Sequence, residues 1–135
     1  MIPYQMEEHT GDIKLKARGV THQELFANAA KGMMVFLYGE EILNKQTDQA
    51  QAVSITSSDP EALLVDWLSE LLYLSNTHYR AYLRFHFSAL DSTHLEAEVG
   101  SVEAEAVDDI KAVTYHQLSI KQRDDHWEAT IVFDI

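Results

Sequence analysis

Hydrophobic and polar residues alternate in several short stretches of the chain. In the clearest one, residues 13–18, apolar side chains occupy the odd positions and basic side chains the even positions. A period of two is typical of a strand with one buried face. Similar patterns predict strands at 53–56, 83–88, 95–99, 116–120 and 127–135. Turn residues at 91–92 and 122–125 predict that the last four strands form two hairpins.

Residues 21–39 follow the helical period instead. Thr21 and Glu24 have the spacing of a capping box, in which each side chain bonds a backbone N–H of the first turn. The apolar residues of 25–37 fall on one helical face, and Gly39 suits the end of the helix. We therefore expect an amphipathic helix over this stretch.

A second helix is predicted to start at Asp59-Pro60. Asp is a good N-cap, and Pro at the first helical position has no N–H to leave unpaired. The apolar residues of 63–74 cover more than half of the helical circumference. A helix with so wide an apolar face needs cover on several sides, so we expect it between a sheet and the other helix.

The order of these elements predicts the fold class. Two helices early in the chain and hairpins after them indicate an α+β fold, with a mostly antiparallel or mixed sheet packed on two amphipathic helices. A length of 135 residues suits a single domain over 1–135. No Gly-rich loop follows a strand, which argues against a βαβ nucleotide-binding fold.

The net charge and the composition of the chain indicate which kinds of partner it can bind. The net charge of −12 disfavours broad electrostatic binding of nucleic acid, so no direct nucleic-acid contact is expected, and a cation or a basic protein surface is the better partner. An acidic surface that serves only solubility is an equal alternative. No apolar stretch approaches a membrane span, and the N-terminal residues lack the features of a signal peptide, so we expect a cytoplasmic protein without a membrane partner.

The acidic residues near the two ends are the first candidate site. In each of their strands the apolar residues occupy alternate positions, and Asp12 and Asp134 fall on the opposite, polar face. If these strands are neighbours, both side chains and the α-carboxylate of Ile135 converge, and a divalent cation would relieve their repulsion. Oxygen ligands favour calcium, magnesium or manganese over zinc or copper. The alternative is that Asp12 ends a loop and Asp134 lies on a solvated edge. His9, three residues before Asp12, is a candidate to orient or add a ligand, and the alternative is a hydrogen-bonded structural histidine.

Three further residues are candidates for contacts with a partner or a ligand. Asp66 lies on the polar side of the second helix, either in a cavity or on a solvated stripe. Lys111 follows an acidic run and either pairs with it or presents its charge to a partner. His116 shares its parity with apolar neighbours, which favours a hydrogen-bonded core histidine over a catalytic one. No nucleophile elbow, Walker loop or His-Glu-x-x-His helix is present, so the sequence gives little support to an enzyme.

Four separated motifs together resemble the archease family across the whole chain. They are Glu-His-Thr-Gly-Asp at 8–12, the Leu-rich block with Asp and Trp at 63–73, Ile-Lys-Ala-Val-Thr-Tyr-His at 110–116 and the final Phe-Asp-Ile. Gly11 stands where the family usually has Ala. Glycine can adopt any backbone conformation that alanine adopts, so the change should leave neighbouring ligands intact.

The resemblance implies an accessory protein and not an enzyme. Its partner would be an RNA-splicing ligase of the guanylylated-histidine type, and it would promote ligase guanylylation and repeated turnover in tRNA splicing and RNA repair. The metal ligands implied are Asp12, Asp134 and the carboxylate of Ile135, with calcium expected in crystals and magnesium or manganese as other options, and Lys111 is carried over as a functional lysine. The alternatives are a chaperone-like modulator of a tRNA cytosine methyltransferase and a metal-dependent phosphate-ester hydrolase.

Overall fold

The computed structural model covers residues 1–135 and has an α+β fold, as predicted. It contains two α-helices, one 3₁₀ helix and seven strands. In chain order these are β1 (Tyr4–His9), β2 (Asp12–Gly19), α1 (His22–Tyr38), the 3₁₀ helix η1 (Glu40–Asn44), β3 (Gln49–Thr56), α2 (Pro60–His78), β4 (Arg80–Leu90), β5 (His94–Glu103), β6 (Ala112–Gln122) and β7 (Trp127–Asp134).

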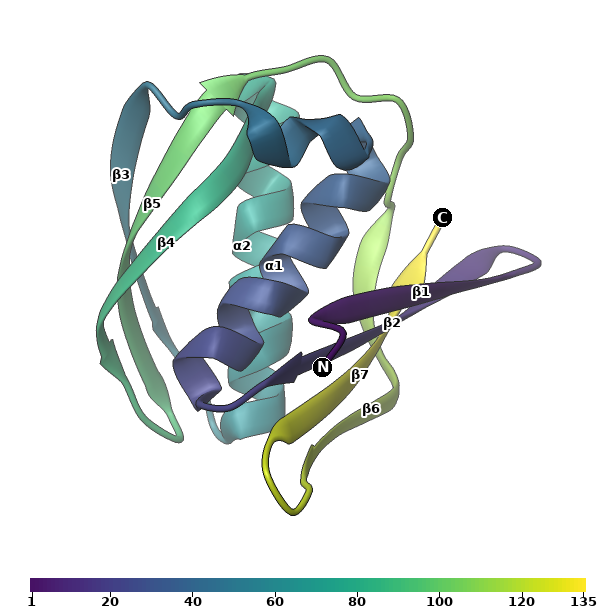
Figure 1. Cartoon of the computed structure of the whole chain (residues 1–135), viewed down its shortest axis with the longest axis vertical. Helices are drawn as coiled ribbons and strands as arrows, with labels where there is room; N and C mark the ends of the chain where they lie inside the picture. Colours follow the sequence, from purple (N-terminus) through teal and green to yellow (C-terminus); the bar gives the residue numbers. More distant parts are fainter.

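The strands divide into two antiparallel sheets. One sheet has four strands in the order β1-β2-β7-β6, and the other has three in the order β3-β5-β4. Figure 1 shows α1 and α2 lying between the two sheets. Each sheet thus buries one face on the helices and leaves the other toward solvent, which explains the alternation of polar and apolar residues in the strands.

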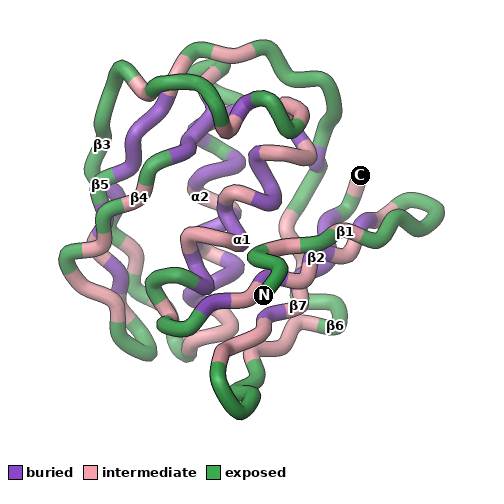
Figure 2. The backbone as a smooth tube through the Cα atoms, viewed as in Figure 1, coloured by how far each residue is buried: buried purple, intermediate pink, exposed green.

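The core lies between the helices and the inner sheet faces (Figure 2). Trp67 of α2 is fully buried, and its indole Nε1–H donates a hydrogen bond to the carbonyl oxygen of Phe26 at 3.0 Å. The same ring packs on Phe85 and Phe87 of β4, with centroid distances of 5.6 and 5.3 Å. Buried Trp needs a partner for its single donor, and here that bond joins the two helices. The central position predicted for the second helix is confirmed.

Both predicted helix starts are confirmed by their caps. The Thr21 hydroxyl accepts a hydrogen bond from the Glu24 N–H at 3.1 Å, and the Asp59 carboxylate accepts one from the Ala62 N–H at 2.8 Å. At its other end, α2 is capped by Tyr79 in the left-handed conformation, with φ of +56°. A non-glycine residue at this position carries backbone strain.

Several elements differ from the sequence predictions. Strand β1 was not predicted, since its apolar positions are only Tyr4 and Met6 and its remaining side chains are polar. Strand β3 begins at Gln49 and not near Val53, because polar residues continue the pairing with β5. The connection after Gly39 contains η1, whose Ile42 is buried.

Candidate metal centre

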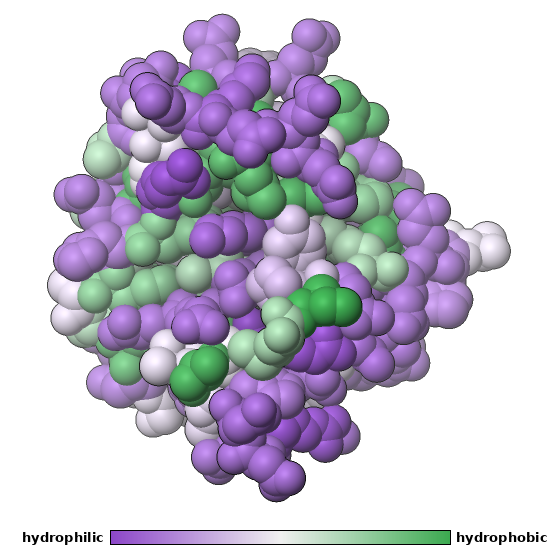
Figure 3. Space-filling model, in the orientation of Figure 1, coloured by the Kyte–Doolittle hydropathy of each residue, from purple (hydrophilic) through white to green (hydrophobic).

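The hairpin of β1 and β2 presents the first candidate residues. His9 and Asp12 are paired across the hairpin, with Thr10 and Gly11 as the two turn residues. Gly11 has a φ of +82°, a conformation that glycine adopts without steric cost. Figure 1 shows this hairpin projecting from the body of the molecule, and the space-filling view shows mostly hydrophilic side chains around it (Figure 3). The turn therefore places His9 and Asp12 at an accessible end of the four-stranded sheet.

Asp12 and Asp134 lie directly opposite each other on neighbouring strands. They are cross-strand partners in the antiparallel pairing of β2 with β7. The Cβ atoms of such partners are about 4.5–5.5 Å apart, and both side chains project from the same face of the sheet. Asp12 is half-buried and Asp134 is exposed. The sequence left the adjacency of these strands as a condition, and the pairing of β2 with β7 meets it and brings two carboxylates together on the outer face of the sheet.

Main-chain hydrogen bonds bring two more of the predicted residues to this end. The Ile135 N–H donates to the Gly11 carbonyl oxygen at 3.2 Å, so residue 135 lies beside the hairpin turn. The Lys111 N–H donates to the Asp134 carbonyl oxygen at 2.7 Å, while the Lys111 side chain is exposed. The side chain of Ile135 packs against the core. The residues around 134 and 135 are thus fixed by neighbours on both sides.

The donor set here fits a hard divalent cation. The Asp12–Asp134 pair offers carboxylate oxygens, and the Ile135 main chain lies beside the hairpin turn. No group of three or more His, Cys, Asp or Glu side chains is arranged to hold a metal ion. The pair alone would therefore leave most of a calcium shell of six to eight oxygens to the main chain, water or a partner.

The structure places His116 differently from the sequence expectation. The pairing of β6 with β7 is irregular between Thr114 and Ser119, and Gln117 has a φ of +55° within this bulge. The bulge breaks the alternation on which the expectation of a core histidine rested, and His116 is exposed. Its ring lines a cavity of about 250 Å³ that also includes His9 and Asp12. His116 therefore belongs to the surroundings of the Asp12–Asp134 pair.

Asp66 is in a different place. Its carboxylate accepts a hydrogen bond of 2.5 Å from the hydroxyl of Ser57, in the connection between β3 and α2. The residue is half-buried. This bond satisfies Asp66 locally, and it ties the start of α2 to the end of β3. Asp66 is not among the residues gathered around Asp12.

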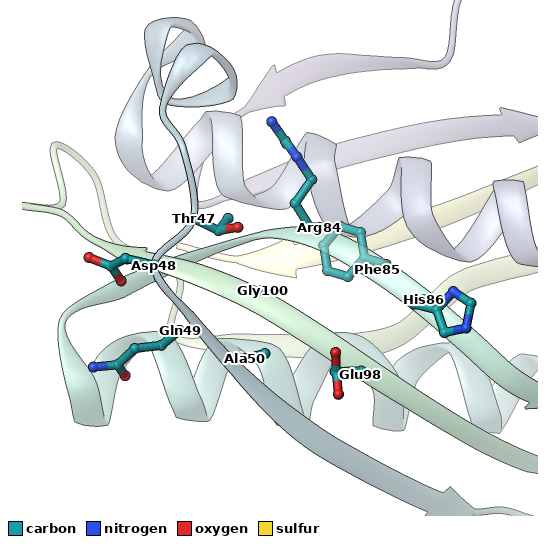
Figure 4. A pocket seen from close by; sticks show the side chains of 9 residues that line it. All are labelled: Thr47, Asp48, Gln49, Ala50, Arg84, Phe85, His86, Glu98 and Gly100. Atoms are coloured by element: carbon teal, nitrogen blue, oxygen red, sulfur yellow. The ribbon is translucent and has the colours of Figure 1, made fainter.

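A second hollow lies on the three-stranded sheet. It has a volume of about 460 Å³, and polar side chains of β3, β4 and β5 surround Gly100 at its floor (Figure 4). A Cβ atom at Gly100 would come within 3.1 Å of Thr47 and Arg84 atoms, so the missing side chain helps to keep this floor open. Asp48 at its rim forms an ion pair with Arg80. None of the predicted site residues lies here.

Comparisons with known proteins place the chain in a family. The model of the archease protein family matches residues 4–135. This chain belongs to the archease family. Protein archease from Methanosarcina acetivorans is 38% identical, with 98% of this chain and 95% of the relative covered. Protein archease from Thermoplasma volcanium is 30% identical, with 98% of each covered.

Two solved structures of similar proteins support the fold. The solution structure of Methanobacterium thermoautotrophicum protein 1598 has a TM-score of 0.79 and 29% identity, with 98% of this chain and 99% of that one covered. An archease from Thermotoga maritima, described as a possible chaperone, has a TM-score of 0.66 and 22% identity, with 96% and 94% covered. At that identity the second likeness shows the fold alone. No helix of this archease-family chain has both the length and the apolar character needed to cross a membrane.

Proposed function

We propose that this chain is an accessory protein that activates an RNA-splicing ligase, using a divalent cation at the Asp12–Asp134 pair. Family membership supports an accessory role, and the carboxylate pair at the projecting end of the sheet supports the cation. The observation that carries the proposal is the direct cross-strand pairing of these residues. Like charges in that position are destabilising unless something offsets them.

The residues of this end have distinct roles in the proposal. Asp12, Asp134 and the carboxyl group of Ile135 would hold the cation, and Lys111 would present a positive charge beside it. A divalent cation held there would offset phosphate charge and help to orient an attacking group during nucleotidyl transfer. The two-residue turn at Thr10-Gly11 lets this end reach into a concave partner site. The chain contributes no nucleophile of its own in this scheme.

The test measures guanylylation of the ligase in the presence of this chain. Asp12→Asn and Asp134→Asn should each reduce the stimulation strongly. Asp124→Asn removes the same charge from the β6–β7 turn at the far end of the sheet, and it should leave the stimulation unchanged. Full stimulation by both site variants would overturn the proposal.

A second candidate is the chaperone-like role that membership of the archease family also allows. In that role the chain would modulate a tRNA cytosine methyltransferase without a need for a cation. Chelation separates the two proposals, because it should abolish ligase activation and leave a chaperone effect intact. An assay of the isolated chain with phosphate esters tests the remaining alternative, a metal-dependent hydrolase.

A further inference from the structure

The cavity next to the Asp12–Asp134 pair has features that cation binding does not use. It lies on the outer face of the four-stranded sheet and has a volume of about 250 Å³. Residues of β1, β2, β6 and β7 line it: His9, Asp12, Lys14, His116, Gln117 and Val132.

Paired strands form this cavity. Val132 is the cross-strand partner of Lys14 and lies on the outward side of β7, yet it is only 5% exposed. The bulge of β6 explains this burial, since it brings His116 and Gln117 into the same cavity as Val132. The floor and one wall are therefore built from hydrogen-bonded sheet, and the cavity is present before any ligand binds.

Most of the polar side chains that line the cavity are hydrogen-bond donors. Lys14 carries three N–H donors, Gln117 carries two, and His9 and His116 each carry a ring N–H in either neutral tautomer. None of these four side chains has a hydrogen bond or an ion pair within the protein. Asp12 is the one carboxylate among the lining residues. A ligand that suits this set is small, anionic and rich in acceptor oxygens.

The volume of the cavity limits the size of the ligand. Pockets for drug-sized molecules measure about 300–1,000 Å³, so this cavity is too small for a nucleoside with its phosphates. A single phosphate group fits its size and its donors. Gln117 at φ +55° adds a second indication, because strained residues concentrate at ligand clamps and bulges often occur next to functional sites.

Basic residues continue from the cavity along β2. Lys14, Lys16 and Arg18 project from the same outer face, since they stand at alternate positions of one strand. Arg18 is bonded to Glu128 at 3.0 Å, whereas Lys16 has no ion pair. Acidic residues lie on the same face, since Glu7 is the cross-strand partner of Lys14 and Glu128 that of Arg18, so the basic residues of β2 alternate with carboxylates on a chain with a net charge of −12. The expectation that nucleic acid makes no contact rested on the total charge, which does not describe this face.

We propose that this cavity binds one phosphate group of an RNA strand or of a nucleotide, beside the Asp12–Asp134 pair. This inference rests on the proposed function for its biological setting, because it gives the phosphorylated substrate of the partner a contact on this chain. Lys14 holds the phosphate by a charge-assisted hydrogen bond, and the histidines and Gln117 complete its shell. An RNA strand would extend from the cavity toward Lys16.

The test titrates the isolated chain, without divalent cation, with inorganic pyrophosphate, guanosine triphosphate and a single-stranded RNA oligonucleotide. Lys14→Gln should weaken the binding of all three by about tenfold, which corresponds to about 1.4 kcal/mol. Lys16→Gln should weaken the binding of RNA alone if RNA is the source of the phosphate. Lys31→Gln on α1 removes the same charge outside the cavity and should change nothing. Equal pyrophosphate affinities of the Lys14→Gln and Lys31→Gln chains would overturn the inference.

Failure of this inference can be told apart from failure of the proposed function. Lys14→Gln leaves both aspartates in place, so calcium should still stabilise this variant as it stabilises the unmodified chain. If the chain activates the ligase but binds no pyrophosphate, the inference of a phosphate site is overturned and the proposed function stands. A chain that binds pyrophosphate through Lys14 but does not stimulate the ligase would support the site and overturn the proposed function.

Discussion

The Asp12–Asp134 pair predicts that one substitution changes stability in opposite directions, depending on the cation. Two carboxylates directly opposite each other on paired strands repel by about 0.2–1 kcal/mol. Asp12→Asn removes this repulsion without changing the shape of the side chain. Without divalent cation, the variant should therefore be more stable than the unmodified chain by about 0.5 kcal/mol.

Addition of calcium should reverse this order. A ligand at a hundred times its dissociation constant stabilises the folded state by about 2.7 kcal/mol. The unmodified chain should gain this amount. The variant has lost one of its two ligating side chains and should gain little, so it becomes the less stable of the two.

The assay is urea unfolding of both chains with calcium and with a chelator, followed by circular dichroism. Any lost carboxylate reduces the general self-repulsion of a chain with a net charge of −12, so Asp124→Asn is the matched control. Its small gain is subtracted from that of Asp12→Asn. An equal calcium-dependent gain for the Asp12→Asn chain and the unmodified chain would refute the reasoning, since Asp12 would then not hold the ion.

Two other predictions concern strain and acid sensitivity. Tyr79→Gly should raise the free energy of unfolding by about 1 kcal/mol in urea titrations, because Tyr79 caps α2 in the left-handed conformation and its side chain is 73% exposed. A loss of stability would instead show that the tyrosine side chain makes stabilising contacts. Burial of His22 against Trp127 lowers the pKa of the imidazole, so its protonation opposes folding. Stability should fall as the pH drops below the unfolded-state pKa of about 6.5, and His22→Gln should reduce that slope; identical slopes would contradict the assignment.

Much of the fold could be predicted from local signals. The caps at Thr21 and Asp59 mark helix starts because they satisfy backbone N–H groups within one turn, and the two C-terminal hairpins follow from alternation and turn residues. Strand β1 escaped prediction because it is an edge strand with little burial, so its sequence shows almost no alternation. The division into two sheets depends on long-range pairing, for which the sequence carries no local signal.

The candidate site was predictable only in part. Parity placed Asp12 and Asp134 on the outer face, and the pairing of β2 with β7 brings them together. The exposure of His116 results from the bulge in β6, where Gln117 adopts the left-handed conformation. Only a glycine would have marked that conformation in the sequence, so the bulge could not be predicted. Helical position alone left Asp66 either in a cavity or on a solvated stripe, and it could not reveal the hydrogen bond from Ser57.

The pairing of β2 with β7 also bears on how the protein is made. Residues from almost opposite ends of the chain meet there, so this pairing has a high loop-closure cost and is expected to form late in folding. Until β7 is present, β2 has only β1 as a neighbour in the sheet. A chain that lacks β7 therefore lacks the cross-strand carboxylate pair on which the proposed cation site depends.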